Sequence, residues 1–357
     1  MPEYRQNPLT REWVILSSER MARPSEFLDQ PARRDSAACP FCLGNEHETP
    51  EELARYSVGD SKDSWSVRVV PNKYPAVTPD PHPGPLPRGE GVCNEDCLFR
   101  TVPALGEHEV IIESPRHVVS LTDLTPAETE LLFLAYRDRI AFHRAAGKAR
   151  YVQAFKNVGP LAGASMEHSH SQLMALEQLP HNVERDAAIA ESYFRRKGRS
   201  LIGAVLQGEL DAGTRVVAQS ASFAAFCPFA SRFPYEVCLA AKASGRPFEE
   251  LQAGEVGELA RITSEIIGRI ERALGPVAYN YYLRPAPFDM ASPGPYDWHI
   301  EIFPRLVKVA GFEWSTGIFI NTVSPEAAAE VLREIGRPSQ AFPGRPNGLG
   351  SQSCFYH

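Results

Sequence analysis

The stretch 164-ASMEHSHSQLMAL-176 governs how the rest of the chain is interpreted. It places His168, His170 and Gln172 two residues apart, directly before an apolar run. Side chains alternate between the faces of a β-strand, so a strand here would point all three to one side of a sheet, within reach of one ligand. The plainer alternative is an amphipathic strand with a histidine-rich polar face. The weak strand propensity of histidine and glutamine argues against it.

The composition is that of a protein that forms a hydrophobic core. The 357 residues, 43% hydrophobic and 23% charged, suffice for two ordinary domains or one large domain. The net charge of −7 argues against a general nucleic-acid-binding protein. No window approaches the roughly 20 apolar residues of a membrane span, and the N-terminus has no apolar signal core. The odd count of 7 cysteines favours a reducing compartment, so we expect a soluble cytoplasmic protein.

Alternation and turn signals predict an α+β protein. A capping box at Thr125 and Glu128, with Pro126 at the first helical position, opens a helix to about Ala146. A second helix is expected at 184–197. The segment 79–99 begins rich in proline and glycine, which predicts an exposed insertion. Strands are expected at 13–16, 67–70, 109–113, 151–157 and through the motif.

The second half of the chain repeats the order of the first. The series strand, helix, strand, loop, strand at 109–176 recurs from 233 to 305, with its helix at 254–274. Laying one copy on the other places His299 on His170 and Glu301 on Gln172. An internal duplication explains this pattern. We expect residues 1–195 to hold the intact motif and residues 196–357 the degenerate copy.

Further motifs follow one another in order along the chain. They are Asn7-Pro8-Leu9-Thr10, Glu12-Trp13-Val14, Arg20 with Arg23-Pro24, Cys39-Pro40-Phe41-Cys42, Val70-Pro71-Asn72-Lys73-Tyr74-Pro75, Glu113-Ser114-Pro115-Arg116-His117 and Phe233-Pro234-Tyr235-Glu236. With the opening stretch, they resemble the galactose-1-phosphate uridylyltransferase family, in the nucleotidyltransferase branch of the histidine triad superfamily. The resemblance spans most of the chain. It implies two histidine-triad-like halves, antiparallel sheets with packed helices, and a homodimer.

The resemblance also implies a covalent mechanism. His170 would attack the α-phosphorus of a nucleotide sugar, and its other ring nitrogen would donate to a backbone carbonyl. Gln172 would donate an amide N–H to a phosphoryl oxygen, a contribution on the order of 3 kcal/mol to the barrier. Because glutamine cannot supply a proton, transfer to a phosphate acceptor should outrun hydrolysis.

The cysteine pair predicts a metal site. Cys39 and Cys42 have the spacing of half a tetrahedral zinc site, although such a pair alone also fits a redox pair or free thiols. The family places His117 and His168 as the other two ligands. Four protein ligands leave no open position, so this zinc would be structural.

Phosphate and nucleoside need donors. By resemblance Arg20 and Arg23 would bind phosphate oxygens, and the alternative is two surface arginines in a loop. Asn72 would face the base or ribose, or is otherwise a turn asparagine. Ser165 could donate to the departing phosphate. Asn157, with its neighbour Lys156, lies close enough in sequence to line the same cleft.

Two departures from the family bear on function. Some members hold a second metal through one acidic residue and three histidines. Here Asp186 could be the acid, but the strand around His299 and Glu301 keeps one histidine, so a second metal is doubtful. The motif reads His-Ser-His-Ser-Gln in place of His-Pro-His-Gly-Gln. With 311-GFEWSTGIFIN-321, this resembles a branch that acts on ADP-glucose by phosphorolysis.

Three hypotheses follow. The leading one is a hexose-1-phosphate uridylyltransferase of galactose metabolism, which converts UDP-glucose and galactose 1-phosphate into glucose 1-phosphate and UDP-galactose. The second keeps the chemistry with ADP-glucose as donor and inorganic phosphate as acceptor. The third is a non-catalytic zinc- and nucleotide-binding protein, and the intact His170 and Gln172 argue against it. The expected partners are therefore a nucleotide sugar and a sugar 1-phosphate or phosphate.

Overall fold

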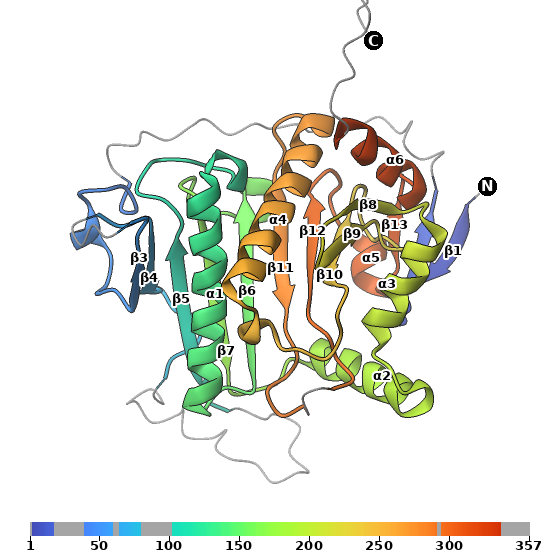
Figure 1. Ribbon diagram of the computed structural model, residues 1–357, viewed down its shortest axis with the longest axis horizontal. Coiled ribbons are helices and arrows are strands. Elements are labelled where there is room, and N and C mark those ends of the chain that lie inside the picture. Colours follow the sequence, from blue (N-terminus) through green and yellow to red (C-terminus); the bar gives the residue numbers. More distant parts are fainter. Residues whose placement is uncertain (1, 18–38, 60–63, 80–101, 291–293, 337–357) are drawn as a thin grey trace, which may run out of the picture.

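The protein is described by a computed structural model for residues 2–17, 39–59, 64–79, 102–290 and 294–336. These segments contain both helices and strands (Figure 1). The helices are α1 Pro126–Ala146, α2 His181–Lys197, α3 Leu201–Ala212, α4 Ala253–Leu274, α5 Gly311–Thr316 and α6 Pro325–Gly336. The strands are β1 Glu3–Gln6, β2 Trp13–Leu16, β3 Ala54–Tyr56, β4 Val67–Pro71, β5 Gly106–Ile112, β6 Tyr151–Val158, β7 His170–Leu176, β8 Val216–Gln219, β9 Phe223–Phe226, β10 Val237–Ala241, β11 Tyr279–Arg284, β12 His299–Pro304 and β13 Phe319–Asn321.

Ten of these strands form one sheet that runs through both halves. Their order is β3-β4-β5-β7-β6-β11-β12-β10-β9-β8, and each neighbouring pair is antiparallel. Reading outward from the β6–β11 seam, each half contributes the same series of five strands. The expected α+β architecture of two similar halves with antiparallel strands is confirmed.

The strand pairing at the seam relates the two halves by an approximate two-fold axis. Phe155 of β6 pairs with Tyr282 of β11. Phe155 also pairs with Gln172 of β7, and Tyr282 pairs with Glu301 of β12. The superposition of Glu301 on Gln172 that the sequence suggested therefore holds in the strand pairing.

Helices α1 and α4 lie side by side across one face of the sheet, over the seam (Figure 1). Helix α1 begins where the sequence predicts it. Thr125 accepts from the Glu128 amide at 3.2 Å, and the Glu128 carboxylate accepts from the Thr125 amide at 2.7 Å. Gly147 ends the helix in the left-handed conformation, with φ 68°. The capping box and glycine stop thus fix the length of the helix that covers this face.

Successive side chains of β5 point to opposite faces of the ten-stranded sheet. Ile111 belongs to the main core with α1 and α4, whereas Val110 and Ile112 pack on the opposite side with Trp65. In the second half α3 covers that opposite face, where Ile202 meets β9 and β10. The first half has no comparable helix among the described residues, and the loop that carries Phe41 packs there instead.

One expectation about the motif strand is wrong. Strand β7 begins at His170, so His168 lies in the bend before it. The period-two argument holds for His170 and Gln172, which pair with Ile112 and Val110 on the face opposite α1. The insertion expected at 79–99 lies, apart from Pro79, outside the described residues, as do Cys93 and Cys97.

The degenerate half fills its own site with ion pairs. Glu301, at the position of Gln172, is bonded by the Arg232 guanidinium, which also lies 2.7 Å from Glu236. Arg284 bridges Glu301 and Asp186, with N···O distances of 3.1 Å to each. Burial would raise the pKa of Glu301, but the two guanidinium groups outweigh it and hold that pKa well below its usual range.

Removing Arg232 is expected to destabilise the fold. The substitution Arg232→Met leaves the buried Glu236 carboxylate without its arginine and Glu301 with Arg284 alone, which costs about 3–5 kcal/mol of unfolding free energy. Arg55→Met is the matched control. It removes a partly exposed pair with Glu52, worth less than about 1 kcal/mol. Urea unfolding measures both, and equal losses would contradict this role of the buried pair.

Candidate functional site

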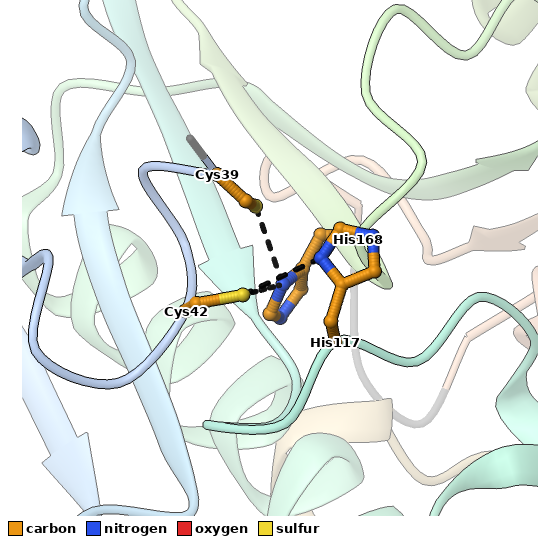
Figure 2. Close-up of side chains that lie close together, drawn as sticks. All are labelled: Cys39, Cys42, His117 and His168. Carbon is orange, nitrogen blue, oxygen red and sulfur yellow. Dashed lines mark hydrogen bonds between the residues drawn. The ribbon is translucent and has the colours of Figure 1, made fainter. Parts of the chain in front are cut away.

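Four side chains from three segments meet beside the start of β7 (Figure 2). Cys39 and Cys42 come from the N-terminal loop, His117 from the segment after β5, and His168 from the bend before β7. One ligand atom of each lies within 4.8 Å of the others. The sequence predicted this set, and the structure brings it together as a group that could hold a metal ion.

The distances fit a tetrahedral ion. The Cys39 and Cys42 sulfurs each lie 3.5 Å from His168 Nδ1, and the Cys42 sulfur lies 3.4 Å from His117 Nδ1. Zinc at ordinary Zn–S and Zn–N lengths would separate sulfur and nitrogen ligands by about 3.6 Å. The four residues therefore have the spacing that a shared cation requires.

Hydrogen bonding sets the tautomer of His168. Its Nε2 lies 2.9 Å from the Ser114 carbonyl, which only accepts, so Nε2 carries the proton. The lone pair of Nδ1 then faces the cysteines, as in a metal ligand with an outer carbonyl partner. Burial lowers the pKa of His168 to about 4, so the ring is neutral.

The pKa of the Cys42 thiol shifts in the opposite direction. Burial, together with the charge of Cys39, raises the pKa of Cys42 to about 11. Two adjacent thiols ionise together only beside a cation, since two thiolates repel each other. The chemistry of the donor set thus agrees with its spacing.

His170 opens β7 with its ring held in one orientation. Its Nδ1 donates to the His168 carbonyl at 2.8 Å, which leaves the lone pair on Nε2. The residue is 7% exposed, and burial lowers the pKa of its ring. The Phe41 ring lies 5.4 Å from the His170 ring, centroid to centroid. A neutral, oriented imidazole of this kind can act as a nucleophile.

Gln172 lies on the same face as His170, two residues further along β7. Its Oε1 is 2.8 Å from Nε2 of His108 on β5. Asn72, at the end of β4, contacts the same His108 nitrogen through its Nδ2 at 3.2 Å. The structure therefore gathers two amide side chains and an imidazole on the face of the sheet that carries His170.

The remaining predicted ligand-binding residues divide into three groups. Asn157 of β6 lies on the face of His170 and Gln172, and its Oδ1 accepts from Asn280 at 2.7 Å. Ser165 is exposed in the loop before β7. Arg20 and Arg23 lie outside the described residues.

The expectation that Lys156 lines the cleft is wrong. Its side chain is 0% exposed and points into the core. Its Nζ lies 2.5 Å from the Glu113 carboxylate and 2.8 Å from the Ser169 hydroxyl, and the Ser169 hydroxyl in turn donates to Glu113 at 2.6 Å. Lys156 neutralises a buried acid behind the motif and is not available to a phosphate.

The residues considered for a second metal are tied together by an arginine. The Arg284 guanidinium lies between Asp186 and Glu301, and His299 Nε2 is 3.3 Å from Glu301. A guanidinium already supplies the positive charge that these carboxylates need. In this structure, Arg284 therefore supplies the positive charge between Asp186 and Glu301.

Two further residues of the site, His108 and Arg284, belong to none of the motifs of the sequence. Alternation offered a signal for the first: His108 precedes Val110 and Ile112 by even steps, and therefore shares their face. For Arg284 no local pattern was available, because its partners lie 98 and 17 residues away in the sequence.

Comparisons with known proteins place this geometry in a family. The model of the galactose-1-phosphate uridyl transferase N-terminal domain matches residues 1–180. A domain of unknown function, DUF4921, matches residues 106–337. An ADP-glucose phosphorylase from Arabidopsis thaliana is 34% identical, with 94% of this chain and 93% of that protein covered. The chain belongs to the galactose-1-phosphate uridylyltransferase family.

Other members of the uridylyltransferase family extend the likeness. A galactose-1-phosphate uridylyltransferase from Thermotoga maritima is 29% identical over 94% of this chain and 98% of its own. The crystal structure of the Arabidopsis thaliana ADP-glucose phosphorylase, with bound ADP-glucose, has a TM-score of 0.78, covering 94% of this chain and 99% of that one. Like these relatives, the chain is a nucleotidyl-transferring enzyme.

Membership in the uridylyltransferase family also accounts for the fold. The solved relatives share the histidine-triad-like architecture that the sequence implied. Within the described segments, no helix has the length and apolar character to cross a membrane.

Lys156 is expected to matter for stability and not for phosphate affinity. Lys156→Met leaves the Glu113 carboxylate buried and unpaired, at a cost of about 3–5 kcal/mol in unfolding free energy. Adding Glu113→Gln removes the stranded charge and should recover most of that loss. Urea unfolding of the two variants measures it. A fully stable Lys156→Met protein with weakened phosphate affinity would reinstate Lys156 as a ligand.

Proposed function

We propose that the protein transfers a nucleoside monophosphate through His170, from a nucleotide sugar to a phosphate acceptor. The Nε2 lone pair forms a bond to the α-phosphorus, and the bond to the sugar 1-phosphate oxygen breaks. The sugar 1-phosphate leaves already ionised, without needing a proton. An oxygen of the acceptor phosphate then attacks the same phosphorus and releases His170.

The observation that carries the proposal is the fixed tautomer of His170. Its Nδ1–H is committed to the His168 carbonyl, so the nucleophilic lone pair is on Nε2. Gln172 on the same face offers an amide that can donate to a phosphoryl oxygen but cannot protonate it. Arg20 and Arg23 remain our proposed phosphate ligands, with Asn72, Asn157 and Ser165 as further contacts to the nucleotide sugar.

ADP-glucose is the proposed donor, with inorganic phosphate as acceptor. The support is the 34% identity, over 94% of the chain, to an ADP-glucose phosphorylase. The products would be glucose 1-phosphate and ADP. The second candidate keeps UDP-glucose as donor and galactose 1-phosphate as acceptor, as the names of the relatives at 24–29% identity suggest.

The metal site is proposed to hold structural zinc. Cys39, Cys42, His117 and His168 would complete a tetrahedron with no open position, so substrate could not bind the ion. When bound, zinc would supply the positive charge that stabilises the two thiolates. It would also fix the loop that carries Phe41 against His170. A cytoplasmic location and a homodimer belong to the same proposal, as does the division into units of 1–195 and 196–357.

Incubation with ADP-glucose or UDP-glucose labelled at the α-phosphorus tests the mechanism. The wild-type protein is expected to retain label after denaturation, and more from ADP-glucose. His170→Ala should retain none, whereas His170→Gly should regain turnover with free imidazole. His47→Ala, a surface substitution, serves as control.

Addition of acceptor separates the candidate reactions. Inorganic phosphate should discharge the labelled protein as ADP, and galactose 1-phosphate should discharge a uridylylated protein as UDP-galactose. Substantial turnover by the alanine variant would overturn the covalent step. Release of mostly monophosphate at saturating acceptor would show a hydrolase.

Zinc content is measured on protein purified without chelator. We expect about one zinc per chain, and its loss in the double variant Cys39→Ser with Cys42→Ser. That variant should unfold at lower urea concentration. Cys227→Ser and Cys238→Ser, which alter buried cysteines away from the cluster, are the matched controls. Full zinc content in the double variant would contradict the assignment.

A further inference from the structure

His108 lies beside Gln172 on the neighbouring strand of the sheet. His108 of β5 pairs with Met174, and Gln172 pairs with Val110, so the two side chains are diagonal neighbours on one face. The ring Nε2 lies 2.8 Å from the Gln172 Oε1. This contact joins His108, which belongs to no motif of the sequence, to the amide of Gln172.

A backbone group fixes the protonation of the His108 ring. The Ala76 amide donates to Nδ1 at 3.2 Å. A backbone N–H can only donate, so Nδ1 carries a lone pair and the proton of the neutral ring is on Nε2. Nε2–H therefore donates to Gln172, and this fixes Oε1 as the atom facing the ring.

The fixed oxygen determines where the Gln172 amide N–H groups point. With Oε1 held by His108, the Nε2 amide lies on the other branch of the side chain. No hydrogen bond to that nitrogen is present among the residues the structure describes. Both of its protons remain for a ligand on the face of His170.

Asn72 does not compete with Gln172 for the proton on His108 Nε2. Its Oδ1 accepts from the Tyr74 amide at 2.9 Å, which fixes the orientation of its own side chain. Its Nδ2 lies 3.2 Å from His108 Nε2, and because both nitrogens carry protons in this tautomer, no hydrogen bond joins them. The Asn72 amide is thus held in place by its own turn, and it too can donate to a ligand.

We propose that His108 is a positioning residue: it orients the Gln172 amide so that its N–H groups, and never its carbonyl, face the transferred phosphoryl group. This inference rests on the proposed function. Without His108 the amide can rotate by half a turn and present an oxygen to an anion. The lost donor would then be replaced by a repulsive contact.

A double-mutant cycle tests the coupling. Single-turnover formation of nucleotidyl-His170 is measured with α-labelled ADP-glucose for the wild type, His108→Ala, Gln172→Ala and the double variant. Gln172→Ala is expected to slow the step about 100-fold. His108→Ala should slow it about tenfold, with little change in KM for ADP-glucose. The double variant should be slowed about 100-fold, because His108 has nothing left to orient.

His108→Gln provides the rescue. Its amide nitrogen can take the place of ring Nε2 and donate to Gln172, so this variant should recover most of the rate. Urea unfolding of each variant separates misfolding from lost orientation. A double variant slowed about 1000-fold would show independent roles and overturn the proposal.

The ring tautomer is measured directly by NMR of histidine-¹⁵N-labelled protein, with His108→Gln used to assign the signal. A proton on Nε2 is expected. A proton on Nδ1 would overturn the proposal whatever the activity. Absence of label on wild-type protein together with the Nε2–H tautomer would instead reject the proposed function and leave the orientation of Gln172 intact.

Discussion

The hydrogen bond from the His170 ring to the His168 carbonyl joins the two ends of the site. His168 takes part twice, since its ring faces the cysteines while its carbonyl sets the tautomer of His170. Its other ring nitrogen is in turn held by the Ser114 carbonyl. Whatever holds the backbone of His168 therefore also orients the His170 ring. In the proposed reaction, the cysteine and histidine cluster would contribute through this orientation and not through contact with phosphorus.

The two halves differ in charge at equivalent positions of the sheet. In the first half, His170 and Gln172 are uncharged, which leaves room for an anionic ligand. In the second half, the position of Gln172 is held by Glu301, and arginines neutralise it. Glu236 lies just before β10, two residues before the partner of Glu301, as His108 lies two residues before the partner of Gln172. In the second half, arginines of the chain itself thus supply the positive charge at this position.

What could be predicted from the sequence was local or repeated. The helix at 126–146 carries its own capping box and glycine stop, and the duplication recurs in order along the chain. The bend before β7 escaped the period-two argument because alternation says nothing about where a strand begins. Lys156 was misassigned because a cation near a phosphate motif and a buried counter-ion look alike in sequence. The contact of His108 could not be predicted because its partner, Gln172, lies 64 residues away in the sequence.

The continuous sheet has a consequence for how the duplicated chain can be divided. At the seam, β6 and β11 hydrogen-bond only to each other and to strands of their own halves. Separating the halves after α2 would leave each with a bare edge of unpaired amides and carbonyls, which recruits other strands. Each half therefore pairs the strand edge that the other half would otherwise expose. The second half is therefore needed to pair the β6 edge of the first half, whether or not it takes part in a reaction.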